Sequence, residues 1–264
     1  MLFVAHLLGI KRIYKLGGAQ AIAAMAYGTQ SIKKVDKIFG PGNQFVTCAK
    51  KLVNLQGIAI DMLAGPSELA IYADKTSVPE FVAADLLSQA EHGNDSQVIL
   101  VTKNQQITAN VMEQLYRQLE LLPRKDIIGK SLSSSRLLVF DKVKEAFDFL
   151  NEYAPEHLII ASKNSKKMAT YVKNAGSVFL GNYSSESAGD YASGTNHSLP
   201  TNGFARTQSG ISVDSFVRKI TFQKINKKGM KNIGPSVQIM ARAEGLDAHK
   251  SAVDFRLKKK YEKF

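Results

Sequence analysis

Leu69-Ala70-Ile71-Tyr72 opens the stretch that decides the fold, which continues through a helical segment at residues 77–92 to Val98-Ile99-Leu100-Val101. Two short apolar runs that flank an amphipathic helix are typical of two parallel strands joined by a crossover helix. The segment has Ser77 three residues ahead of Glu80, a proline in its first turn and Gly93 after its last residue. These residues predict where the helix begins and ends.

The same alternation continues on both sides of this stretch. Further apolar runs predict strands at residues 12–16, 37–39, 58–60, 137–140, 158–160 and 177–180. Helical periodicity predicts helices at residues 19–27, 44–55, 105–122, 143–153 and 165–174. Strands, turns and helices in this order predict a Rossmann-like α/β fold, with parallel sheets and flanking helices.

We expect two α/β units and a tail. The first unit, residues 1–125, opens on an apolar run without a cap, as if a helix were entered part-way, and is therefore expected to be incomplete at its N-terminus. The second, residues 126–225, contains a polar stretch at 181–210 without predicted secondary structure, and loops of this length are usually functional. Residues 226–264 are expected to form a basic helical tail with helices at 235–244 and 247–260.

Composition excludes several classes of protein. No apolar run approaches the ~18 residues of a membrane span, so no membrane partner is expected. The single cysteine, Cys48, rules out an internal disulfide and a thiolate zinc cage, and it favours a cytoplasmic protein. Any metal would need His, carboxylate or amide ligands.

The charge balance is strongly basic. The net charge is +12, and 11 Lys and Arg stand against 4 Asp and Glu from Lys224 onward. Such a surplus is compatible with nucleic-acid contact, attraction of an anionic cofactor or a solvated helix surface. Aromatic residues are too sparse in the tail for a stacking platform, so we expect a solvated surface and no nucleic-acid partner.

The end of the helical segment carries the first candidate site. Gln89 and His92 are three residues apart and therefore share one helix face. An amide oxygen and an imidazole on a rigid element are half of a credible metal site. The alternative is a polar helix end that meets solvent.

Glu156 and His157 form the second candidate site, at a predicted junction between a helix and a strand. A histidine near its ordinary pKa of about 6.5 is a natural proton acceptor at neutral pH, and an adjacent carboxylate suits acid/base chemistry. The alternative is a surface turn.

Two further places concentrate polar residues. Asp190 and His197 lie among small residues in the long loop, which is otherwise interpreted as solvated, and Glu244 and His249 flank a helix break at Gly245. Four of the five histidines fall in such stretches, and with Gln89 and Asp190 they offer mixed nitrogen and oxygen ligands that suit zinc.

The run Gly40-Pro41-Gly42-Asn43 precedes a predicted helix. Backbone N–H groups at a helix start attract anions, so this turn is a candidate phosphate cradle. It lacks the third glycine of the dinucleotide fingerprint and is weak evidence by itself.

Four runs, in this order, resemble the histidinol dehydrogenase family: Ser88-Gln89-Ala90-Glu91-His92-Gly93, Tyr153-Ala154-Pro155-Glu156-His157-Leu158, Gly189-Asp190-Tyr191-Ala192-Ser193-Gly194-Thr195-Asn196-His197 and Ala243-Glu244-Gly245-Leu246-Asp247-Ala248-His249. The resemblance runs from the first residues to near the C-terminus. It implies oxidation of L-histidinol to L-histidine through L-histidinal, the last steps of histidine biosynthesis, with zinc positioning the substrate and NAD accepting hydride.

The resemblance also implies roles for particular side chains. Four match the family's zinc ligands: Gln89, His92, Asp190 and His249. Two match its acid/base pair, Glu156 and His157. Contacts to the substrate are implied for the zinc ligands, His157, Ser67 and Glu244, and contacts to NAD for Gln20 and Asn43. His197 lies in the family's substrate loop, and its role stays open.

Further expectations concern the assembly. The family resemblance implies a homodimer in which Glu244 and His249 complete the neighbour's site. Family chains carry a further N-terminal segment about as long as a domain, so we expect either a truncated, inactive product or one half of a split enzyme that needs its missing piece. A non-catalytic zinc-binding or basic interaction protein, and a zinc hydrolase that uses Glu156, stay open as alternatives.

Overall fold

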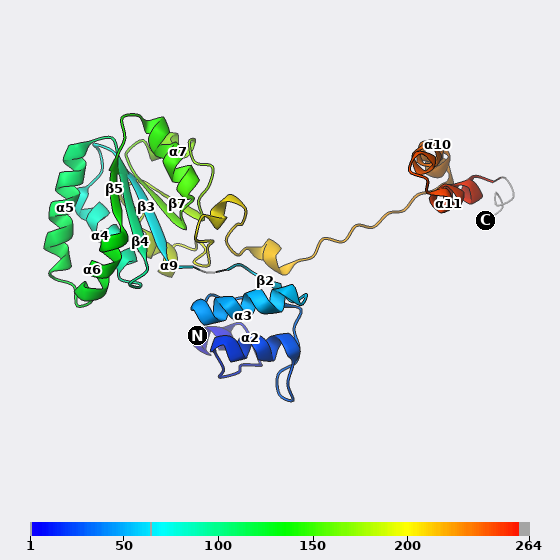
Figure 1. The fold of residues 1–264 in the computed structure, drawn as a ribbon, viewed down its shortest axis with the longest axis horizontal. Helices are drawn as coiled ribbons and strands as arrows, with labels where there is room; N and C mark the ends of the chain where they lie inside the picture. Colours follow the sequence, from blue (N-terminus) through cyan, green and yellow to red (C-terminus); the bar gives the residue numbers. More distant parts are fainter. Residues whose placement is uncertain (1, 64, 259–264) are drawn as a thin grey trace. The chain divides into compact units, whose positions relative to one another are not determined.

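The computed structural model describes residues 2–63 and 65–258. The chain forms two compact units, Met1–Phe216 and Val217–Phe264, and each is described by itself (Figure 1). Among the described residues, no helix combines the length and apolar character that crossing a membrane requires.

A five-stranded parallel sheet forms the centre of the first unit, with the strand order β5-β4-β3-β6-β7. The strands are β3 (Glu68–Ala73), β4 (Gln97–Thr102), β5 (Arg136–Val139), β6 (His157–Ala161) and β7 (Ser177–Leu180). β3 and β6 are buried along their whole length, because helices cover both faces of the sheet.

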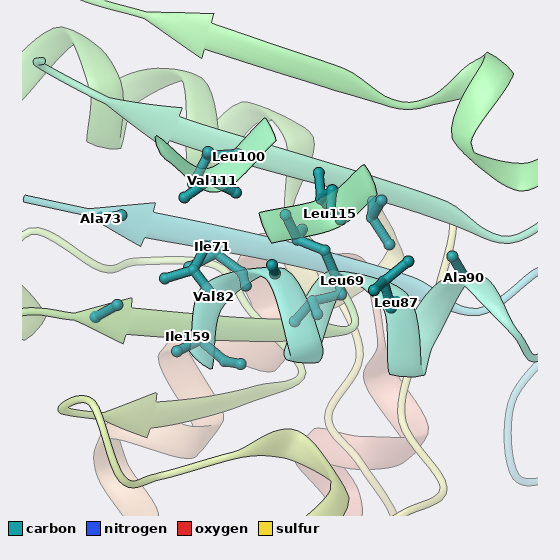
Figure 2. Packing of buried hydrophobic residues seen from close by; sticks show 14 of the residues in the cluster. Leu69, Ile71, Ala73, Val82, Leu87, Ala90, Leu100, Val111, Leu115 and Ile159 are labelled. Atoms are coloured by element: carbon teal, nitrogen blue, oxygen red, sulfur yellow. The ribbon is translucent and has the colours of Figure 1, made fainter. Parts of the chain in front are cut away.

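The helices fall into two groups around this sheet (Figure 1). One face packs against α4 (Pro79–Ala90), α5 (Gln105–Leu119) and α6 (Lys125–Ser134), and the other against α7 (Val143–Tyr153) and α8 (Ser165–Ala169). Leu69 and Ile71 of β3 point toward Val82 and Leu87 of α4 (Figure 2), whereas the ring of Tyr72 packs at a tilt against that of Phe147 of α7. Because successive side chains of β3 point to opposite faces of the sheet, they contribute to two separate cores, one on each face.

The N-terminal part of the first unit has a small core of its own. It contains α1 (Leu2–Leu7), α2 (Gly18–Tyr27) and α3 (Gln44–Leu55), with β1 (Lys37–Ile38) parallel to β2 (Ala59–Ile60). The core consists of five buried residues: Ile22, Ala26, Ile38, Val53 and Ile58.

The remaining elements are short or belong to the second unit. α9 (Glu186–Tyr191) and the 3-10 turns η1 (Phe204–Arg206) and η2 (Val213–Phe216) follow β7. The second unit holds α10 (Lys227–Ala243) and α11 (Asp247–Leu257), which pack together where Gly234 lies against Val253 and Leu257.

The predicted α/β class with parallel sheets and flanking helices is confirmed. The predicted domain boundary after residue 125 does not separate two sheets, because β4 and β5 lie on either side of it and pair with each other. The second compact unit begins at Val217, nine residues ahead of the predicted tail at 226.

Several predicted elements need correction. Residues 12–16 form no strand, and most of this segment is exposed, without a described neighbouring strand to pair with. The helix predicted at 77–92 is shorter at both ends, with Val78 as its N-cap, because Ser77 bonds back to Asp74 through its backbone N–H and forms no side-chain cap. The predicted helix at 247–260 ends at Leu257, and residues 259 and 260 lie outside the described residues.

Candidate active site

The last turn of α4 supplies the first polar side chains of the site. Gln89 is 1% exposed, and His92 stands just beyond the helix end, which its backbone N–H closes by bonding to the carbonyl of Gln89 over 3.3 Å. The two residues therefore lie at the same helix end, with Gln89 buried on the last turn and His92 exposed just beyond it.

α9 faces this helix end with two carboxylates. Glu186 and Asp190 are four residues apart on α9, and Ser185 caps that helix at the backbone N–H of Ala188. His92, Glu186 and Asp190 each offer one ligand atom, and these atoms lie within 4.8 Å of one another. The structure thus brings the predicted ligands His92 and Asp190 together and adds Glu186.

The start of β6 supplies the acid/base pair. Ala154 caps α7 in the left-handed conformation with φ of 50°, and the chain turns there into β6. Glu156 accepts a hydrogen bond from the backbone N–H of Glu68 over 3.0 Å. His157 Nδ1 lies 3.3 Å from the carbonyl oxygen of Glu68, which can only accept, so Nδ1 carries the proton in this contact.

The other ring nitrogen of His157 is the notable atom of the site. Nε2 is buried, has no hydrogen-bond partner among the described residues, and lies 3.8 Å from Oδ1 of Asp190. Because Nδ1 holds the proton of the neutral ring, Nε2 presents a lone pair. The residue is arranged as a base.

Burial shifts the pKa values of this cluster. Burial lowers the pKa of His157 to about 4, which keeps the ring neutral at pH 7. Burial, with the nearby charges of Glu68 and Asp190, raises the pKa of Glu156 to about 8. Burial and the adjacent Asp190 likewise raise the pKa of Glu186 to about 8. The carboxyl groups of Glu156 and Glu186, shielded from water, therefore retain their protons at neutral pH, and a bound cation would displace these protons.

A cavity of about 260 Å³ opens beside the pair, and Ser67, His92, Glu156 and His197 contribute to its lining. His197 lies with Nδ1 3.1 Å from Oδ1 of Asp190, although its side chain is 60% exposed. Ser67 thus lines the cavity, and its implied contact with a substrate stays a prediction, whereas His197 has Asp190 as a specific neighbour.

A second cavity, of about 390 Å³, adjoins the start of α3, and Gly42, Asn43, Thr47 and Asn202 are among its lining residues. Asn43 caps α3, with Oδ1 accepting from the N–H groups of Phe45 and Val46, each over 3.1 Å. The candidate phosphate turn therefore does begin a helix.

The other predicted site residues lie elsewhere. Gln20 is exposed on α2 and does not line either of these two cavities. Glu244 caps the end of α10, and His249 is in the first turn of α11, both exposed in the second compact unit. Their predicted approach to a neighbour's site stays a prediction.

The cluster occupies the amino edge of the sheet. Ser67 precedes β3, His92 precedes β4, and His157 is the first residue of β6. Ligands of open α/β sheets usually bind at the opposite, carboxyl edge. The cluster in this chain instead lies at the end of α4, where the negative end of the helix dipole would favour a cation.

Sequence reasoning missed Glu186 and Glu68. Glu186 falls in a stretch predicted to lack secondary structure, although its spacing of four residues from Asp190 was a usable signal. Glu68 begins β3, and its backbone is the partner of both Glu156 and His157. No sequence pattern identifies a backbone contact of this kind.

The fold and site define a class: a parallel α/β protein in which imidazoles and carboxylates converge beside a cavity at the amino edge of the sheet. A family model described as histidinol dehydrogenase matches residues 1–257. This chain belongs to the histidinol dehydrogenase family.

Individual relatives agree. Histidinol dehydrogenase of Bacteroides thetaiotaomicron is 60% identical over 257 residues, 97% of this chain. That of Vibrio parahaemolyticus is 52% identical over 261 residues, 98% of this chain. The crystal structure of histidinol dehydrogenase from Elizabethkingia anophelis has a TM-score of 0.95 and 59% identity, covering 97% of this chain and 59% of that one. The chain spans about 60% of the length of the curated relatives it matches.

Proposed function

We propose that this chain carries the substrate- and metal-binding part of a zinc- and NAD-dependent histidinol dehydrogenase, which acts in the cytoplasm and oxidises L-histidinol to L-histidine through L-histidinal. Family membership supports the reaction class. The observation that carries the proposal is the buried, unpartnered Nε2 of His157 beside the group formed by His92, Glu186 and Asp190.

The residues present fit zinc. One imidazole and two carboxylates converge, with the Gln89 amide next to them, and mixed nitrogen and oxygen donors suit this metal. Gln89, His92 and Asp190 would hold it, with His249 as the fourth ligand. When bound, zinc would fix the imidazole and amine of histidinol while NAD accepts hydride from the carbinol carbon.

His157 is the base of the first oxidation. Its neutral ring holds a proton at Nδ1 against the carbonyl of Glu68 and keeps Nε2 free. Nε2 takes the hydroxyl proton of histidinol as hydride leaves the carbinol carbon, and the aldehyde forms. The low pKa of His157 keeps the acceptor form available at neutral pH.

Glu156 serves the second oxidation. Its ionised carboxylate takes a proton from water as the water oxygen bonds to the aldehyde carbon, and the former carbonyl oxygen takes up the proton that His157 gained in the first oxidation, which completes the hydrate. Loss of a second hydride and of two protons from the hydrate then yields the carboxylate of L-histidine. Since the pKa of Glu156 is raised to about 8, the ionised form increases as pH rises toward that value.

Asn43 and Gln20 are proposed to contact NAD. The cavity at the start of α3 supports a role for Asn43, because N–H groups at a helix start favour a phosphate. Glu244 and His249 are proposed to reach the partner subunit in a homodimer, so that each site would use both chains.

The test is NADH formation from L-histidinol by the zinc-loaded chain, measured at 340 nm, alone and with the N-terminal portion of a relative supplied separately. We expect NADH in at least one arrangement, and a strongly reduced rate with His157→Asn. Absence of NADH in both arrangements would overturn the proposal. Zinc-dependent ester hydrolysis without NADH would indicate the hydrolase alternative, and zinc binding with neither activity a non-catalytic protein.

A further inference from the structure

Two short helices face each other across the candidate metal site with matched pairs of polar residues. α4 contributes Gln89, with His92 just beyond its end, and α9 contributes Glu186 and Asp190. Residues three or four apart share a helix face, so each helix presents its pair in one direction. Three of these four are predicted ligands, and the fourth, Glu186, has no role in the proposed reaction.

Glu186 is buried and bound to Gln89. Its side chain is 2% exposed, and the Nε2 group of Gln89 lies 3.0 Å from Oε1 and 3.1 Å from Oε2 of Glu186, in the amide orientation that satisfies both residues. Oγ of Ser88, which donates to the carbonyl of Asp85 over 2.9 Å, also lies 3.5 Å from Oε2 of Glu186. The carboxyl group is thus occupied by neighbours on α4.

This contact decides which end of the amide is available to a metal. Only the oxygen of a glutamine side chain is a ligand, because its nitrogen carries two hydrogens and no free lone pair. When a bound cation has displaced the proton of Glu186, a rotated amide would set its oxygen against the two carboxylate oxygens, which can only accept, and that arrangement is repulsive. Glu186 therefore selects the amide orientation of Gln89 in which Oε1 of Gln89 points away from the Glu186 carboxylate.

We propose that Glu186 is a positioning residue, which grips the amide nitrogen of Gln89 so that the amide oxygen is directed at zinc. This inference rests on the proposed function, because it needs the zinc site. Mutation of a group that fixes the orientation of a metal ligand typically lowers metal affinity 10–100-fold, and we expect an effect of about this size for Glu186.

The decisive measurement is a double-mutant cycle on zinc affinity, determined with the full chain by competition against a chromophoric chelator. Glu186→Gln is expected to weaken zinc binding about 10–100-fold in the wild-type background. In the Gln89→Ala background the same change is expected to have almost no effect, because the group it positions is gone. Glu80→Gln, an exposed glutamate in the first turn of α4, is the matched control and should leave affinity unchanged.

Each result bears on the proposal. Equal affinity of Glu186→Gln and the wild type would overturn it, and so would additive losses in the double variant, since these would make Glu186 a direct ligand. A wild-type chain that binds no zinc would also overturn it. The histidinol assay judges the proposed function independently, so that failure there leaves the affinity comparison intact. Unchanged far-UV circular dichroism of the variants excludes misfolding as the cause.

Discussion

At the scale of single residues, the two ring nitrogens of His157 stand in different environments. One ring nitrogen is committed to a backbone carbonyl, and the other is buried without a partner among the described residues. An unpaired buried acceptor costs stability, on the order of 1–3 kcal/mol, so it marks a position kept for a substrate.

Substitution of this residue is the first prediction. Asparagine in place of His157 can still donate to the carbonyl of Glu68, but it removes the base at Nε2. We expect kcat for histidinol oxidation to fall about 10²–10⁴-fold, with a much smaller change in KM. NADH formation under steady-state conditions measures both, and His6→Asn on α1 is the control. A His157→Asn variant with wild-type kcat would contradict the assignment.

Asp85 carries a second prediction, on stability. Burial raises the pKa of Asp85 from 3.8 to about 7, so between these values the folded chain holds a proton that the unfolded chain has released. The free energy of unfolding must then fall as pH rises through this window, by about 1.4 kcal/mol for each pKa unit. Asp85→Asn removes this contribution.

Urea unfolding of the zinc-free chain at about pH 5 and about pH 8 measures the effect. We expect a smaller drop in stability across this range for Asp85→Asn than for the wild type, while Asp126→Asn, exposed on α6, behaves as the wild type. A drop of the same size in Asp85→Asn would contradict the predicted linkage.

At the scale of elements, a buried ion pair fixes the turn that begins α3. Lys50 and Asp61 are each 2% exposed and form a salt bridge. Lys50 also donates to the carbonyls of Gly40 and Met62 over 2.9 and 2.7 Å, and Asp61 accepts from the N–H of Gly40 over 2.7 Å. The turn that leads to Asn43 is therefore held from both sides.

Removal of one partner leaves a buried charge unpaired, which typically costs about 3–5 kcal/mol. Lys50→Met should lower the free energy of unfolding by this amount, whereas Lys51→Met, on the exposed side of α3, should change it by less than about 0.5 kcal/mol. Denaturant titration compares the two. Equal stability of Lys50→Met and the wild type would show that the turn does not depend on the pair.

Sequence periodicity predicted the elements that bury a clear apolar face. α3, α7 and β7 have the predicted ends, because their apolar residues repeat with the period of the element. Sequence periodicity failed to predict the ends of elements where tertiary packing overrides the local helix preference of the residues. α10 begins at Lys227 and runs through Pro235, since Gly234 allows close contact with Val253 of α11.

Weak patterns explain the other misses. α6 buries only Ile128 and Ser131, and α9 is six residues long, so neither leaves a periodic apolar signal. The same holds for the site. The pair Glu156 and His157 could be predicted because the two residues are adjacent in sequence. The contact between Glu186 and Gln89 could not, because it depends on how α4 and α9 pack.

At the scale of the whole molecule, the proposed homodimer predicts complementation between inactive variants. If His249 serves the neighbouring site, a dimer of one His157→Asn chain and one His249→Ala chain contains one site with both defects and one intact site. Random reassociation of equal amounts should then restore about a quarter of the wild-type activity. Variants are mixed, unfolded, refolded together and assayed for NADH, with each variant refolded alone as the control. Recovery no greater than in these controls would indicate sites built from one chain.

Because the candidate site lies at the amino edge of the sheet, the loops at the other edge lie away from it. Lys103, Asp141 and Lys163 lie there on exposed turns after β4, β5 and β6. Exposed loop tips of this kind accept inserted peptides more readily than any other part of a domain. An affinity tag or a fluorescent reporter inserted at these turns would lie a full strand length from the candidate site, so this edge is suited to attaching the protein to a surface while the cavity stays accessible.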